Sequence, residues 1–143
     1  MINILFISNY PKDNQHSMKR YADTHAKILK TNKDINIEHF PIKDIIFNNK
    51  NNKFFRFFNK YIFFSIYIFF KSLRYDLIHI SDQGNAFLKL FIFKKTVITC
   101  HDLILYKKKK NSFKEKLYSN LNLIGMKLAD QIIAVSKNTK KDL

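Results

Sequence analysis

Short apolar runs alternate along the chain with longer stretches of helical periodicity. Five runs have the length and composition of β-strands, at residues 2–8, 35–40, 76–80, 96–99 and 132–136. Apolar strands that alternate with helices must be covered on both faces, which is typical of a doubly wound parallel sheet. The pattern therefore predicts an α/β fold.

Two of the intervening stretches have clear helical spacing. Met18, Ala22, His25 and Leu29 fall on one face of a helix that we expect to run to about residue 30. A later helix carries apolar residues on one face at Phe113, Leu117, Leu121, Ile124 and Leu128. Ser112, with Glu115 three residues later, has the spacing of a capping box, so we expect this helix to begin after Ser112.

One helical stretch is unusually apolar. Residues 61–70 read YIFFSIYIFF, with Ser65 as the single polar residue, and follow a low-complexity segment at 47–58 that we interpret as a loop. Ten residues are about half of the roughly 20 needed to cross a bilayer, so we expect no transmembrane span. The helix either packs against the sheet or dips an outer face into an anionic membrane surface, and both can hold. The residues expected at that surface are Phe54, Phe55, Arg56, Phe57, Phe58 and Lys60.

Length and charge narrow the class of protein. A chain of 143 residues forms one ordinary domain, and its 26 Lys and Arg against 11 Asp and Glu give a net charge of +15. Such a charge favours polyanions, either nucleic acid or an anionic membrane, although a codon bias toward Lys, Asn, Ile and Phe also contributes. With two glycines in the whole chain, glycine-rich phosphate loops are excluded.

Cysteine usage and the N-terminus indicate the compartment. A single cysteine excludes an internal disulfide, and the N-terminus does not resemble a signal peptide, so we expect a cytoplasmic protein. A nucleic-acid-binding module is the competing class, but the aromatic residues cluster in one apolar run instead of interleaving with charges. We therefore expect no nucleic-acid partner.

Polar residues follow several predicted strands directly. Asn9 lies beyond the first strand, Asp82 beyond the third, and Ser136 closes the fifth. The fourth strand ends in TVITCHD, which places Cys100, His101 and Asp102 together. Because doubly wound sheets bind ligands at the carboxyl ends of their strands, these residues predict a site at one rim.

The roles within Cys100, His101 and Asp102 differ. Cys100 is interpreted as a buried packing residue. A zinc site is not expected, because adjacent residues of an extended chain point to opposite faces and no CxxC or HxxxH partner exists. His101 is either a functional residue of the rim or a histidine at the edge of the core.

Four segments in order resemble the N-terminal, acceptor-side domain of a family 4 glycosyltransferase, a retaining GT-B enzyme that uses nucleotide-sugar donors. They are MINILFISNYP with SMKRYADTHAKIL, YDLIHISD, TVITCHDLILY and KLADQIIAVSKNTKKDL. The resemblance covers essentially the whole chain. It implies that residues 1–143 form a single Rossmann-like domain, equivalent to the N-terminal half of a GT-B fold.

The resemblance also implies roles for individual residues. His101 matches the catalytic histidine of the interdomain cleft, and the substrate-binding residues that the resemblance implies are Ser17, Lys19, Arg20, Tyr21, Asp102 and Ser136. Asn9 and Asp82, placed at the same rim by the strand ends, complete the expected substrate-binding set. One departure lies at residues 16–19, where His, Ser, Met and Lys replace the paired glycines of the family. Side chains with a Cβ restrict the approach of backbone N–H groups to a ligand.

The resemblance assigns no donor-binding residues to this sequence. In GT-B enzymes the nucleotide-binding residues belong to a second Rossmann-like domain, whereas this sequence ends at Leu143. We therefore expect the C-terminal donor-binding domain to be absent and the chain alone, truncated or split, to transfer no sugar, since orientation of both reactants supplies much of the rate.

The resemblance implies several partners. They are a nucleotide sugar once a C-terminal domain is supplied, a cell-envelope or lipid-linked acceptor, and the anionic inner face of the cell membrane. No cofactor and no metal are expected. The alternative is a non-catalytic basic module that binds membranes or nucleic acid, or that pairs with a separately encoded second half.

Overall fold

The computed structural model describes residues 1–10, 15–45, 57–103, 106 and 112–143. Within them the chain forms a five-stranded sheet in the order β2-β1-β3-β4-β5, with every pair parallel. The strands are β1 (Ile2–Ser8), β2 (Ile35–Pro41), β3 (Leu77–Ile80), β4 (Lys95–Cys100) and β5 (Gln131–Ala134). The predicted α/β fold with a Rossmann-like parallel sheet is confirmed.

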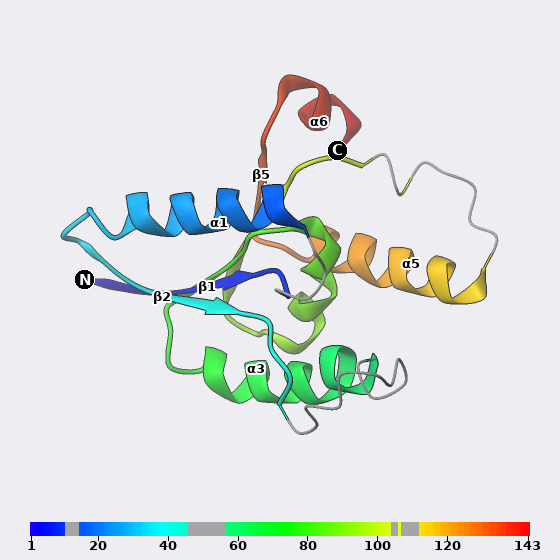
Figure 1. Ribbon diagram of the computed structural model, residues 1–143, viewed down its shortest axis with the longest axis horizontal. Coiled ribbons are helices and arrows are strands. Elements are labelled where there is room, and N and C mark those ends of the chain that lie inside the picture. The colour runs from blue at the N-terminus through cyan, green and yellow to red at the C-terminus, as the bar shows by residue number, and fades with distance from the viewer. Residues whose placement is uncertain (11–14, 46–56, 104–105, 107–111) are drawn as a thin grey trace.

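One helix covers the first face of the sheet. Helix α1 (His16–Leu29) lies above the strands in Figure 1 and buries Ala22 and Ala26. These alanines pack with Ile4 and Phe6 of β1 and Ile37 of β2, and Leu29 packs against them. Ala22 and Leu29 belong to the predicted apolar face, whereas Ala26 was not predicted.

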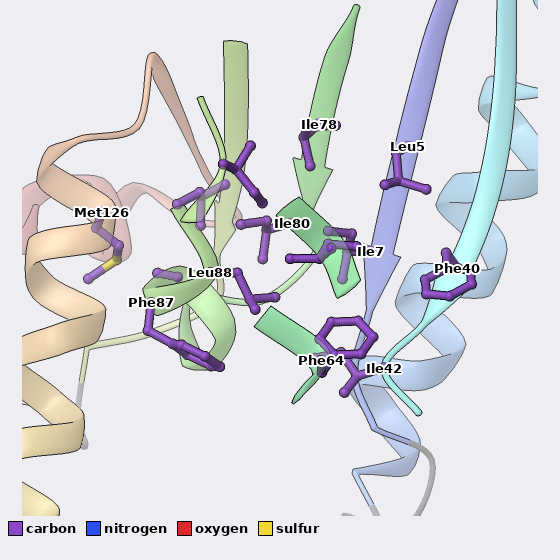
Figure 2. Close-up of a cluster of buried hydrophobic side chains, with 14 of the residues drawn as sticks. Leu5, Ile7, Phe40, Ile42, Phe64, Ile78, Ile80, Phe87, Leu88 and Met126 are labelled. Atoms are coloured by element: carbon purple, nitrogen blue, oxygen red, sulfur yellow. The ribbon is translucent and has the colours of Figure 1, made fainter. Parts of the chain in front are cut away.

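The opposite face carries the main core. It is covered by the π-helical turn η2 (Asn59–Phe63) continuing into α3 (Phe64–Ser72), by the 3₁₀ helix η3 (Gln83–Phe91) and by α5 (Phe113–Lys127). Figure 2 shows Leu5 and Ile7 of β1 and Ile78 and Ile80 of β3 facing Phe64, Leu88 and Met126. Burial of apolar residues on both faces explains why the strands read as continuous apolar runs.

Helix α5 begins where predicted but packs differently from a simple apolar-in helix. Ser112 is its N-cap residue, yet the Ser112 side chain makes no capping hydrogen bond, so the capping-box prediction is wrong in that respect. The inward face consists of Ser119, Asn122, Gly125 and Met126, while four of the five predicted apolar residues are exposed: Phe113, Leu117, Ile124 and Leu128.

A close backbone approach explains that inverted face. A Cβ built on Gly125 would lie 2.0 Å from the carbonyl oxygen of Ala86 in η3, so the two backbones nearly touch. Beside it, Asn122 Oδ1 accepts a hydrogen bond from the backbone N–H of Phe87 at 3.0 Å. At Gly125 no side chain fits between α5 and η3, so the closest part of the contact is made by a glycine and a hydrogen-bonding residue, and Met126 is the large apolar residue that α5 buries there.

The C-terminal part differs slightly from the prediction. β5 ends at Ala134, before Ser136, which caps the short helix α6 (Lys137–Asp142). Among the described residues, no helix combines the length and the apolar character that a bilayer crossing needs.

Candidate functional site

The carboxyl ends of β1, β3 and β4 bring polar side chains together at one rim of the sheet. Asn9 Nδ2 donates hydrogen bonds to the Asp82 carboxylate and to the Gln15 side chain, just before α1. Asn9 Oδ1 accepts from Asn85 Nδ2 at 2.8 Å, and Asp82 Oδ1 accepts from the N–H of Gly84 at 2.7 Å. The predicted convergence of Asn9 and Asp82 at this rim is therefore observed.

His101 is held from several sides at the same rim. Its backbone N–H donates to Gln83 Oε1 at 2.9 Å, and its carbonyl oxygen accepts from Thr139 Oγ1 at 2.9 Å. Its ring nitrogen Nε2 lies 3.0 Å from the carbonyl oxygen of Ser81, which can only accept, so Nε2 carries the proton. The Tyr21 ring packs edge-on at a centroid distance of 4.7 Å.

These contacts leave one ring nitrogen of His101 for a ligand. Nδ1 makes no hydrogen bond to any residue in the described part of the chain, and the side chain is half-buried. With the proton fixed on Nε2, the Nδ1 lone pair can accept a hydrogen bond or a proton from a hydroxyl group. His101 thus has the geometry of a positioned acceptor.

Gln83 is a residue that the strand-end rule missed. It is 6% exposed, and its amide connects two backbone groups: Oε1 accepts from the N–H of His101, and Nε2 donates to the carbonyl of Asp102 at 3.0 Å. Asn85 was also missed; it is buried, and its Oδ1 has no hydrogen-bond partner among the residues that the structure describes. Both belong to the polar run SDQGN that follows β3, a signal already visible in the sequence.

A sequence model of the family described as Glycosyltransferase Family 4 matches residues 13–143. The chain belongs to glycosyltransferase family 4. The match spans α1 to α6 and includes the rim residues Asp82, Gln83 and His101, whereas β1 and Asn9 precede it. A glycosyltransferase-type function is therefore supported. No curated protein matches the sequence at a significant level.

In this family 4 domain, Cys100 and Asp102 flank the histidine in different roles. Cys100 is fully buried, and burial, with the nearby carboxylates of Asp102 and Asp82, raises the pKa of its thiol to about 11. A thiol with that pKa is protonated at neutral pH, which agrees with packing and excludes a nucleophile. Asp102 is half-buried, and its carbonyl oxygen accepts from Gln83; a substrate-binding role for it stays a prediction.

Ser136 contacts His101 only indirectly, through Thr139. Its Oγ accepts the backbone N–H of Thr139 at 3.0 Å, which caps α6. Thr139 is buried and donates its own hydroxyl to the carbonyl oxygen of His101. By capping α6, Ser136 holds Thr139 where it contacts His101. Direct contact of the exposed Ser136 with substrate stays a prediction.

The predicted binding segment at the start of α1 divides into two parts. Tyr21 is half-buried and touches His101, whereas Ser17, Lys19 and Arg20 are exposed. Of the four, Tyr21 is the one whose ring packs on a rim residue. The other three stay predictions.

Beneath α1, a row of aromatic and imidazole rings crosses the sheet. His25 lies between Tyr21 and His79, with centroid distances of 5.5 and 5.3 Å, and His79 Nε2 lies 2.9 Å from Thr99 Oγ1. Burial, with repulsion from His25, lowers the pKa of His79 to about 4. His79 is therefore neutral at pH 7, as a strand-packing residue should be.

Two further predictions concern metals and the membrane. In the described ranges no three His, Cys, Asp or Glu side chains cluster closely enough to hold a metal ion. Of the predicted membrane residues, Phe54, Phe55 and Arg56 lie outside the described residues. Phe57 is 51% exposed and packs on Tyr61, while Phe58 and Lys60 are partly buried.

Proposed function

We propose that this domain is the acceptor-side half of a retaining glycosyltransferase. The complete enzyme would transfer a sugar from a nucleotide-sugar donor to a cell-envelope or lipid-linked acceptor. The observation that carries the proposal is the fixed ring of His101, whose Nε2–H is occupied and whose Nδ1 is open, in a chain of glycosyltransferase family 4.

The rim offers complementary groups for a sugar. His101 Nδ1 accepts a hydrogen bond from a sugar hydroxyl, because Nε2 is already occupied by the carbonyl oxygen of Ser81. Asn9 and Asp82 hold each other in place, so a ligand meets an arrangement that needs little reorganisation. Preorganised hydrogen-bonding groups of this kind recognise the hydroxyls of a carbohydrate.

Catalysis requires a second Rossmann-like domain. That domain supplies the groups that bind the donor diphosphate, and the cleft between the two domains orients donor and acceptor. The proposal therefore includes a lack of transferase activity for residues 1–143 alone, and a peripheral position at the cytoplasmic face of the membrane, where a lipid-linked acceptor is accessible.

The test compares the chain alone with a fusion to the donor-binding domain of a family 4 enzyme. Both are incubated with a panel of nucleotide sugars and lipid-linked acceptors, and products are detected by mass spectrometry. We expect no product from the chain alone and transfer by the fusion. The NMR spectrum of the product should show the same anomeric configuration as the sugar in the donor, as a retaining enzyme produces.

Variants of the fusion assign the site. His101→Ala should lower kcat/KM about 100-fold or more, because a positioned proton acceptor contributes on that scale. Asn9→Ala should cost about tenfold, since it releases Asp82 and Asn85 together. Asn120→Ala, on an exposed position of α5, is the matched control and should leave the rate unchanged. Turnover by the chain alone, or full activity of His101→Ala, contradicts the proposal.

A further inference from the structure

The helix formed by η2 and α3 has large apolar side chains on both of its faces. Its inner face places Phe64 and Ile68, each 0% exposed, in the main core. Its outer face carries Ile62, Ile66 and Phe70 at 40%, 50% and 63% exposure. A surface helix normally turns polar residues to water, so the outer face is the unusual one.

The two serines of this helix lie on its inner side. Ser65 and Ser72 are fully buried, and each hydroxyl donates at 2.8 Å to a carbonyl oxygen of the preceding turn, Tyr61 and Phe69 respectively. The hydroxyls are satisfied within the helix and need no partner from the core. Polar groups therefore lie inside while large apolar groups lie outside.

A single apolar surface results. We define the α3 outer face as Ile62, Ile66, Phe70, Leu73 and Phe93. The first four are spaced four, four and three residues apart, which aligns them along the helix. Phe93, 81% exposed between η3 and β4, is connected to them through Phe69, whose ring packs edge-on against Phe93 at 6.0 Å and against Phe70 at 4.9 Å.

The charged residues in the two segments that form this face are all basic. Residues 57–75 contain Lys60, Lys71 and Arg74 and no Asp or Glu, and Phe93 is followed by Lys94 and Lys95. Lys71 is paired with Glu38 of β2 at 2.7 Å. Arg74 and Lys95 are exposed. An apolar face with a basic rim is complementary to a surface of anionic headgroups above acyl chains.

A second copy of the chain fits the face less well. A two-fold dimer through the α3 outer face would bring each patch onto itself, and with it Arg74, Lys94 and Lys95 of both copies. Like charges at the rim of an interface repel, whereas anionic lipid neutralises them.

We propose that the α3 outer face inserts into the interface of a bilayer that contains anionic phospholipid. The helix lies in the membrane plane, with its apolar side chains about 5–10 Å into the headgroup and acyl boundary. The opposite side of the sheet, covered by α1, faces away from the lipid (Figure 1). This inference deepens the peripheral membrane position proposed above and rests on it. Binding needs no donor, acceptor or second domain, so a failure to bind vesicles is distinguishable from a failure to transfer sugar.

The experiment is flotation of the purified chain with vesicles of phosphatidylcholine alone or with about one third phosphatidylglycerol. We expect binding to the anionic vesicles that weakens as NaCl is raised, and little binding to the neutral ones. Ile66→Asp combined with Phe70→Asp should lower the partition coefficient about tenfold or more, because two apolar side chains lose their favourable insertion and add negative charge.

Ile28→Asp is the matched control. Ile28 is 62% exposed on α1, on the other side of the sheet, and carries the same substitution as Ile66. This variant should bind like the unsubstituted chain. Equal loss in Ile28→Asp and the α3 variant overturns the proposal, as does unchanged binding of the α3 variant. A dimer in vesicle-free solution that the α3 variant dissociates assigns the face to a second copy and also overturns it.

A second measurement tests insertion without the aspartate substitutions, which could impair folding. Phe70→Cys and Ile28→Cys are labelled with an environment-sensitive fluorophore; the native Cys100, buried with a thiol pKa of about 11, reacts slowly. Anionic vesicles should shift the emission to the blue at position 70 and leave position 28 unchanged. A shift at position 28 alone, or at neither position, contradicts insertion of the α3 outer face.

Discussion

Gln83 holds the backbone of the candidate catalytic histidine and of the residue after it. Its side chain accepts from His101 N–H and donates to Asp102 C=O, and its own carbonyl oxygen accepts from the hydroxyl of Tyr106 at 3.3 Å. The His101 ring is then fixed by Ser81 and Tyr21. Gln83 is therefore a positioning residue, since none of its contacts touches a reacting atom.

Removing the Gln83 amide should loosen the rim. Gln83→Ala leaves the partly buried His101 N–H and Asp102 C=O without partners, so the free energy of unfolding should fall by about 1–3 kcal/mol in urea titrations. The NMR signals of the His101 ring should broaden or shift. Gln131→Ala, at an exposed position of β5, is the control and should change stability by less than about 0.5 kcal/mol. Equal stability of both variants would refute the positioning role.

At the scale of elements, the apolar pattern identified all five strands because each is a short buried run of a parallel sheet. It missed the 3₁₀ helix η3 (Gln83–Phe91), which begins after Asp82, where the Asp82 side chain accepts a hydrogen bond from the N–H of Gly84. It also gave no direction for the apolar face of α5, because the inward direction depends on a backbone contact between Gly125 and Ala86, residues 39 positions apart. Contacts between distant segments are invisible to local periodicity.

The same limit applies to the candidate site. Strand-end positions predicted Asn9, Asp82 and His101, because the sheet topology alone places them at one rim. Gln83 and Asn85 act through the shape of the turn after β3, which no pattern specified.

The contact between α5 and η3 has a direct test. Gly125→Ala would ordinarily favour a helix by up to about 1 kcal/mol, but here the new Cβ meets the backbone of Ala86, which cannot rotate away. We expect a net loss of roughly 2 kcal/mol or more in the free energy of unfolding, as overpacking of a fixed interface produces. The control Asn120→Ala, exposed on the same helix, should be neutral or slightly stabilising. A Gly125→Ala variant as stable as the parent would show that α5 lies farther from η3.

For the whole molecule, the layer between α1 and the sheet couples stability to pH. Burial lowers the pKa of His79 to about 4 and also lowers the pKa values of His25 and His39, which surround Phe6 with it. Asp23, 3.8 Å from His39, partly opposes the shift at that residue. In the unfolded chain these imidazoles protonate near pH 6.5, so the folded state binds fewer protons between about pH 6.5 and 4.

Stability should therefore fall as the pH decreases through that window. His79 alone accounts for about 3 kcal/mol by pH 4, since each unit of pKa difference corresponds to about 1.4 kcal/mol. In His79→Gln, whose amide can still meet Thr99 Oγ1, the difference in unfolding free energy between pH 7.5 and 4.5 should shrink by about 2–3 kcal/mol. His16→Gln, exposed at the start of α1, should keep the slope of the parent. An unchanged slope in His79→Gln would mean that acid unfolds the domain through its carboxylates, and that α1 tolerates a charged imidazole beneath it.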